Sequence, residues 1–203
     1  GGTMLARVDQ GPTLSFSTRA DEPDLLQAWI DVEPGPHRLT LSPQGDGEVR
    51  IFGVSAERAG PGVIVDAIGI RGRQAKSWLT WDENLAGQMM TALDPDLVVL
   101  AYGTNEAADP DYTMEDYADD LRAVLTRLRD SRPHAACVLA GPSDRGIKKS
   151  RTTPWIWDRT EPVAEVQRQV APEFGCVFWD WQQASGGPGS VSYTHLRAHE
   201  TTV

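Results

Sequence analysis

The chain has 203 residues, of which 40% are hydrophobic, and its formal net charge is −10. This length can hold one α/β domain, or one and a half smaller ones, and the apolar content argues against a disordered chain. The negative charge argues against non-specific binding to nucleic acid or to an anionic membrane surface. No apolar run approaches the ~20 residues that cross a bilayer, and no signal peptide is visible.

Short alternating segments, separated by Gly and Pro turns, make up the chain from Leu14 to about Ser55. They are Leu14–Ser17, Leu26–Val32, Arg38–Leu41 and Glu48–Phe52. A period of two residues predicts antiparallel strands with one solvated face. Because four strands are few for a complete sandwich, we predict a partial antiparallel β-sandwich over residues 1–58.

From Gly62 onward the pattern changes to strands that alternate with helices. Buried parallel strands are predicted near residues 63–68, 97–102, 136–140 and 176–179. Helices are predicted between Arg73 and Leu93, from the N-cap Thr113 to Asp130, and from about Thr160. This order predicts an α/β domain with a doubly wound parallel sheet over residues 59–190. Right-handed crossovers would bring the loops Gly69–Gly72, Gly103–Asn105 and Gly141–Ser143 to one sheet edge.

Asn105 stands at the end of the strongest of these strands. The apolar run Leu97–Leu100 leads directly into Ala101–Glu106. An Asn amide just outside the carboxyl end of a strand can donate hydrogen bonds to a developing oxyanion. The alternative is a structural one, in which Asn105 caps the turn and Gly103 relieves backbone strain.

The glycine loops together resemble those of the SGNH (GDSL-like) hydrolases, and most of all the bacterial peptidoglycan O-acetylesterases, whose third block reads Gly-Thr-Asn-Glu. The resemblance covers roughly Phe52 to Ser190. Its most specific pieces are Leu93–Leu97 with Tyr102–Glu106, and Phe178–Trp181 with Gly186–Ser190. It implies a three-layer, flavodoxin-like α/β fold, preceded by a sandwich like a carbohydrate-binding module. It also implies a cofactor-free serine esterase that removes acetyl groups from a polysaccharide outside the cytoplasm.

The resemblance also assigns residues. The backbone N–H of Gly72 and the side chain of Asn105 are the candidate oxyanion donors. Thr104 and Glu106 are candidates for substrate contact, and for Glu106 the alternative is to anchor the loop by accepting backbone N–H bonds. The family's Gly-Asp-Ser and Asp-x-x-His blocks do not occur in the sequence. We therefore predict an internal part of a longer esterase, inactive by itself.

The remaining candidates are less specific. Residues 191–203 do not resemble the family, and we expect a non-native, disordered tail in which His195 and His199 are not metal ligands. Cys137 and Cys176 are predicted to be buried free thiols, with a disulfide as the alternative. The Trp pairs 155/157 and 179/181 either line a sugar-binding cleft or place one ring of each pair in the core.

Two other functions remain open from the sequence. One is a non-catalytic domain, which binds carbohydrate or is an inactive hydrolase-like relative. The second is a flavodoxin-like nucleotide binder, which is disfavoured because no Gly-rich phosphate loop opens a helix. Metal binding is not predicted, since the sequence has no His or Cys cluster at ligand spacing.

Overall fold

A computed structural model of the chain describes residues 1–148, 154–156 and 159–190. These residues belong to two compact units, Gly1–Ile68 and Gly69–Val203. The predicted tail over residues 191–203 lies outside the described residues, as do its two histidines and Trp157.

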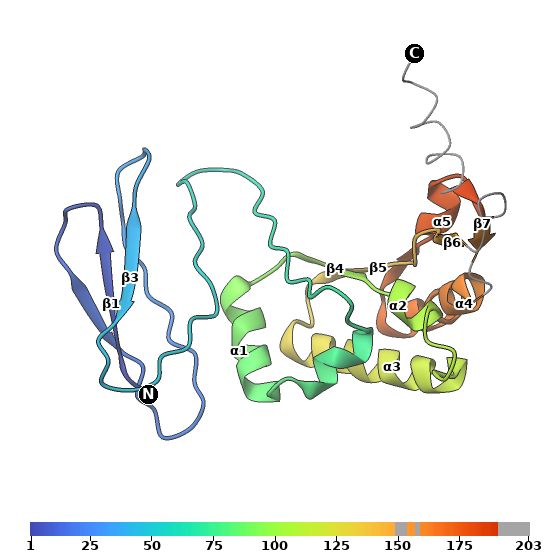
Figure 1. Cartoon of the computed structure of the whole chain (residues 1–203), viewed down its shortest axis with the longest axis horizontal. Coiled ribbons are helices and arrows are strands. Elements are labelled where there is room, and N and C mark those ends of the chain that lie inside the picture. The colour runs from blue at the N-terminus through green and yellow to red at the C-terminus, as the bar shows by residue number, and fades with distance from the viewer. Residues whose placement is uncertain (149–153, 157–158, 191–203) are drawn as a thin grey trace, which may run out of the picture. The chain divides into compact units, whose positions relative to one another are not determined.

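The first unit is built on one antiparallel sheet of three strands (Figure 1). Its central strand β1 (Thr3–Val8) pairs with β2 (Leu14–Ser17) and β3 (Leu39–Pro43). Met4 and Ala6 of β1 are buried, as period-two alternation requires of a strand with one packed face. The antiparallel strands over 14–17 and 38–41 are thus confirmed, whereas the central strand was not predicted.

Two other predicted strands of this unit are absent. Leu26–Val32 and Glu48–Phe52 are described but form no strand. Trp29 is 73% exposed and Phe52 52% exposed, so neither segment has a packed face. Alternation marks a strand only when another layer covers its apolar side, and Gly1–Ile68 contains no second sheet to do so.

The second unit contains the predicted parallel sheet. Strands β4 (Leu97–Ala101), β5 (Ala136–Ala140) and β8 (Val177–Trp179) lie in the order β4-β5-β8, with every pair parallel. Helix α3 (Met114–Ser131) connects β4 to β5, and α4 (Thr160–Val170) lies between β5 and β8. The α/β class is therefore confirmed.

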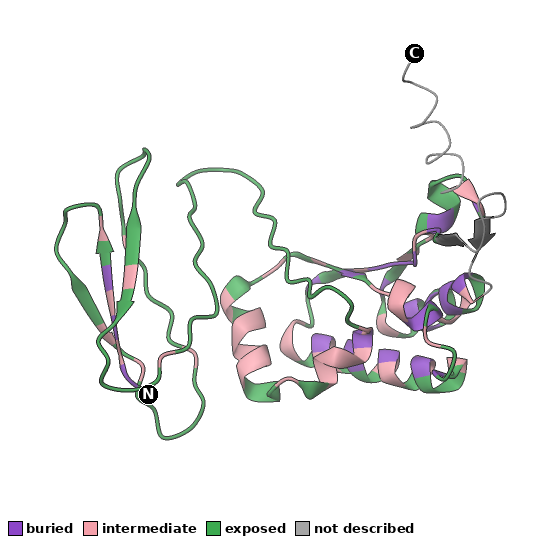
Figure 2. Ribbon diagram, in the orientation of Figure 1, coloured by how far each residue is buried: buried purple, intermediate pink, exposed green. Residues whose placement is uncertain are grey.

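Helix α3 forms as its sequence predicts. The Thr113 hydroxyl accepts the Asp116 N–H at 3.0 Å and so caps the first turn. The buried side chains recur at helical spacing and pack in the core beneath the sheet: Tyr117, Leu121, Val124, Leu125 and Leu128. Figure 2 shows this buried stripe along α3.

The predicted helix between Arg73 and Leu93 is two elements instead of one. A 3₁₀ helix η1 (Ala75–Thr80) is followed by α1 (Glu83–Leu93). The break occurs because the Asp82 carboxylate accepts the Leu85 N–H at 2.9 Å and starts a new helix.

The unit also contains five short elements. They are α2 (Thr104–Ala107), the hairpin of β6 (Gly146–Lys148) and β7 (Pro154–Ile156), the 3₁₀ helix η2 (Ala171–Phe174) and α5 (Trp181–Ala184).

The strand predicted near residues 63–68 is also absent. Val63 and Val65 are 89% and 85% exposed, and the segment has no regular structure. An apolar run becomes a buried strand only between neighbouring strands, and no strand of the described residues pairs with it.

The parallel sheet of the second unit is covered on one face only. Leu100 and Leu139 pack on α3 and α4, whereas the opposite face leaves Leu97 and Val177 exposed. The described residues thus supply two layers of the expected three-layer arrangement.

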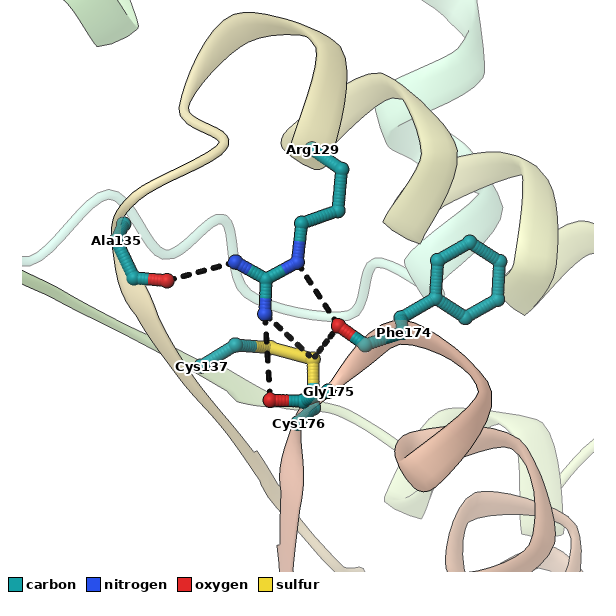
Figure 3. Close-up of a disulfide and its surroundings, with 6 residues drawn as sticks. All are labelled: Arg129, Ala135, Cys137, Phe174, Gly175 and Cys176. Carbon is teal, nitrogen blue, oxygen red and sulfur yellow. Dashed lines mark hydrogen bonds between the residues drawn. A yellow bond between two sulfur atoms is a disulfide. The ribbon is translucent and has the colours of Figure 1, made fainter.

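Cys137 and Cys176 form a disulfide, so the prediction of two free thiols is wrong. Cys137 lies in β5, and Cys176 directly precedes β8. Arg129 of α3 extends over the bridge and donates to the carbonyl oxygens of Ala135 at 2.7 Å and Phe174 at 2.9 Å (Figure 3). The prediction that each cysteine lies in a buried apolar run is correct. The two runs belong to neighbouring parallel strands, and this pairing brings the two sulfur atoms together.

Candidate active site

The carboxyl ends of the three parallel strands are level with one another. Ala101 of β4, Ala140 of β5 and Trp179 of β8 share one row of the register. The chain leaves each strand at this row, so the loops that begin at Tyr102 and Gly141 meet at one edge, as predicted.

Gly103 is where two of these loops touch. Its φ of +118° is a conformation that side chains rarely adopt. A Cβ atom at this position would lie 2.9 Å from Cδ of Pro142 and 3.0 Å from Cγ1 of Val163. Close backbone approach and positive φ both require glycine here.

Glu106 joins the Gly103 loop to η1. Its side chain is fully buried; Oε1 accepts the Ala75 N–H at 2.6 Å and Oε2 accepts the Gly103 N–H at 2.8 Å. Burial raises the pKa of the Glu106 carboxyl, and the two N–H donors partly oppose that rise. With no exposed surface, the carboxylate acts as a loop anchor, and direct contact with a substrate does not fit this geometry.

Asn105 makes a second connection to the same segment. Its Nδ2 donates to the carbonyl oxygen of Arg73 at 2.8 Å. Since an amide nitrogen carries two hydrogens, this bond leaves one for another acceptor. The side chain is only half-buried, so a ligand at the sheet edge can reach it.

Gly72 directly precedes Arg73, whose carbonyl oxygen accepts the bond from Asn105. A turn closed by the bond from Arg73 N–H to the Ile70 carbonyl holds Gly72 at a φ of +77°. Gly72 is exposed, and among the described residues its N–H has no hydrogen-bond acceptor. The Asn105–Arg73 bond therefore connects the Asn105 side chain to the residue that follows Gly72. Thr104, which directly precedes Asn105, is the first residue of α2 and is half-buried.

The chain is similar to known proteins in sequence and in structure. The model of the GDSL-like lipase/acylhydrolase family matches residues 42–201. The chain belongs to this family. It is also similar to a solved structure of a peptidoglycan O-acetylesterase, with a TM-score of 0.59 and 29% sequence identity. That match covers 64% of this chain and 37% of the other, so the chain spans little more than a third of that structure. No protein with a curated function matches the sequence.

The predicted resemblance to this branch of the GDSL-like hydrolases is thus confirmed. The roles of Gly72, Asn105 and Thr104 stay predictions, because the comparisons assign no residue of this chain.

Two residues that support the edge of this GDSL-like chain were missed by the sequence analysis. The Trp78 indole N–H donates to the Tyr102 hydroxyl at 3.0 Å, and Gln167 Nε2 of α4 donates to the Tyr102 carbonyl at 2.9 Å. Tyr102 directly precedes Gly103, so these bonds fix the start of the loop. No sequence motif could have identified them, since each partner comes from a distant element.

A buried carboxylate lies on the loop that follows β5. Asp144 is 5% exposed; Oδ1 accepts a bond from Gln182 Nε2 at 3.0 Å, and Oδ2 lies 3.4 Å from the Ser190 hydroxyl. This network joins the β5 loop to α5 and to the Gly-rich segment after it. Ser143, the last residue of the predicted Gly141–Ser143 loop, directly precedes Asp144.

Two features are absent from the described residues. No group of three or more His, Cys, Asp or Glu side chains in this part of the chain is arranged to hold a metal ion. None of its helices is both long and apolar enough to cross a membrane.

Proposed function

We propose that this chain is part of a serine esterase that removes acetyl groups from a polysaccharide, peptidoglycan, outside the cytoplasm. Membership of the GDSL-like acylhydrolase family supports esterase chemistry. The similarity to a peptidoglycan O-acetylesterase supports the acetyl group and the polymer. In this proposal the chain contributes the oxyanion-binding edge, and the rest of the polypeptide contributes the serine and its base.

The observation that carries the proposal is the bond from Asn105 to the Arg73 carbonyl, which holds the amide beside the turn of Gly72. When a serine hydroxyl attacks an acetyl carbonyl, the carbonyl oxygen gains a negative charge. The second hydrogen of Asn105 Nδ2 and the Gly72 N–H are the donors proposed to stabilise it. Each donor contributes about 3–4 kcal/mol in the transition state.

The acyl-enzyme pathway then needs only water. The base takes the serine proton during attack and gives it to the sugar oxygen as the C–O bond breaks, so that the sugar leaves with a free hydroxyl. Water hydrolyses the resulting acetyl-serine through a second oxyanion at the same two donors. Thr104, half-buried at the start of α2, is the proposed contact to the acyl group.

The disulfide supports the proposed location. Cystine bridges such as Cys137–Cys176 persist mainly in oxidising compartments, which include the periplasm and the cell exterior. Peptidoglycan lies in those compartments as well.

The test compares Asn105→Ala with Asn84→Ala in the complete esterase, with acetate release from O-acetylated peptidoglycan as the assay. Asn84 lies on the exposed surface of α1 and is the matched control. Asn105→Ala should lower kcat by roughly 10²–10³ with little change in KM, since the lost bond strengthens in the transition state. An unchanged kcat would remove Asn105 from the oxyanion site.

A second candidate is a non-catalytic carbohydrate-binding domain. The sequence alone leaves this alternative open. The same assay separates the two, because a non-catalytic protein binds O-acetylated glycan and releases no acetate.

A further inference from the structure

Two exposed indole rings stand at the carboxyl edge of the sheet. Trp179, the last residue of β8, is 47% exposed, and Trp181, the first residue of α5, is 40% exposed. The rings stack with their centroids 5.9 Å apart and an interplanar angle of 22°. The expectation that one of them is a core residue is therefore wrong. An exposed aromatic pair of this kind marks an interaction surface.

The backbone that carries the two rings is fixed. Asp180 lies between them, and its carboxylate accepts the Gln183 N–H and an Arg168 Nη2 bond, each at 3.0 Å. The Trp179 carbonyl accepts the Gly141 N–H at 2.9 Å. Because these bonds already order the segment, a ligand that stacks on the rings meets a preformed surface.

The rings lie on the same edge as the candidate oxyanion donors. Trp179 shares a register row with Ala101, two strand spacings away, which is about 10 Å. Asn105 follows Ala101 by four residues, on the loop that leaves this row. An acetyl group is far too small to span the separation between Trp179 and Ala101, whereas a short chain of sugar rings spans it.

We propose that Trp179 and Trp181 form a platform on which one saccharide ring of the substrate stacks while an acetyl group carried by another ring lies near Asn105. The proposal rests on the proposed function. One face of a pyranose presents C–H groups with partial positive charge, which complement the negative π face of an indole. A nucleobase also stacks on indole, but the net charge of −10 repels its phosphates.

The test measures binding of a four-sugar N-acetylglucosamine oligomer to the chain as it stands. The readout is the set of indole N–H signals in a ¹⁵N-correlated NMR spectrum, for the seven tryptophans of the chain. We expect two of these signals to shift with added oligomer. Trp179→Ala and Trp181→Leu should each weaken binding about tenfold or more, and Trp181→Tyr should retain it within about threefold.

Val177→Ala is the matched control. Val177 is 64% exposed on the same sheet face as Trp179 but is not aromatic. Its replacement should leave binding unchanged, and circular dichroism should show that every variant is folded.

Three results would overturn the platform. One is the absence of any indole shift up to the solubility of the oligomer, and another is equal weakening by Val177→Ala. The third is a shift of the same two signals with protein concentration alone, which would show that a second copy covers the rings. Since sugar binding needs no nucleophile, these results are independent of acetate release. An esterase that fails this test loses the platform but keeps the proposed function.

Discussion

The side-chain amide of Asn105 donates to the carbonyl oxygen of Arg73, and this bond joins two segments that are 32 residues apart in the sequence. The neighbouring Glu106 joins the same two segments through Ala75 N–H and Gly103 N–H. Two hydrogen bonds, from Asn105 to Arg73 and from Ala75 to Glu106, thus fix the segment after the Gly72 turn against the Asn105 loop. Preorganised donors are effective because they need no rearrangement when charge develops.

Replacing Glu106 by Gln should destabilise the domain. The amide offers one acceptor oxygen where two N–H groups need one each, so a buried donor is left facing another donor. We expect a loss of about 2 kcal/mol in the free energy of unfolding, measured by urea titration. Glu115→Gln, on the exposed first turn of α3, is the control and should change stability by less than about 0.5 kcal/mol. Equal stability of the two variants would contradict the anchoring role.

Two glycines should respond to alanine in opposite directions. Gly103→Ala places a Cβ 2.9 Å from Pro142 at a φ of +118°, and should cost about 3 kcal/mol or more in unfolding free energy. Gly87→Ala lies within α1 with nothing within 4 Å of the new Cβ, and should gain about 0.5–1 kcal/mol. A tolerated Gly103→Ala would mean that the two loops do not meet as described.

The disulfide should contribute much of the stability of the second unit. The two cysteines are 39 residues apart, and the chain-entropy relation gives about 4 kcal/mol for a loop of that length. We expect the double variant Cys137→Ala, Cys176→Ala to lower the urea midpoint accordingly. The same loss should follow when a reductant such as TCEP is added to the unaltered chain, whereas the double variant should not respond to it. A midpoint independent of TCEP would show that the thiols are free.

The sequence predicted best the elements whose signals are local. Helix α3 has its cap Thr113 and a 3.6-residue apolar period within one segment, and β4 and β5 are continuous apolar runs. The same rules failed for residues 63–68, because a strand also needs neighbours that are remote in sequence.

The residues of the candidate site show the same difference between local and distant signals. Gly103 and Asn105 follow an apolar strand, and this placement predicted their edge. Gln167, in contrast, reaches Tyr102 across 65 residues. The disulfide partners were likewise visible as buried cysteines but not as a pair, since pairing depends on the register of two strands.

The ionisation of His37 gives a prediction for the first unit. Its Nδ1 lies 2.8 Å from Asp9 Oδ2, and its Nε2 lies 2.6 Å from the Glu33 carbonyl oxygen. Both partners are acceptors, so the ring satisfies both only when each nitrogen carries a hydrogen. The hydrogen bond to Asp9, and then that to Glu33, therefore raise the pKa of His37 above 6.5. The bond from His37, followed by that from the Arg38 N–H, lowers the pKa of Asp9 below 3.8.

The sign of the pH effect follows from these two directions. The raised pKa of His37 means that its contribution is complete below pH 6.5 and is lost as the pH rises through the folded value. The lowered pKa of Asp9 means that its contribution is present above pH 3.8 and is lost as the pH falls. The pair should therefore hold residues 33–37 against the Asp9 turn most firmly between these two pH values.

An NMR titration of the His37 ring should give a pKa above 6.5. Asp9→Asn should bring that pKa down, whereas Asp31→Asn, an exposed aspartate of the same unit, should leave it unchanged. A His37 pKa that does not respond to Asp9→Asn would show that the two side chains are not paired in solution.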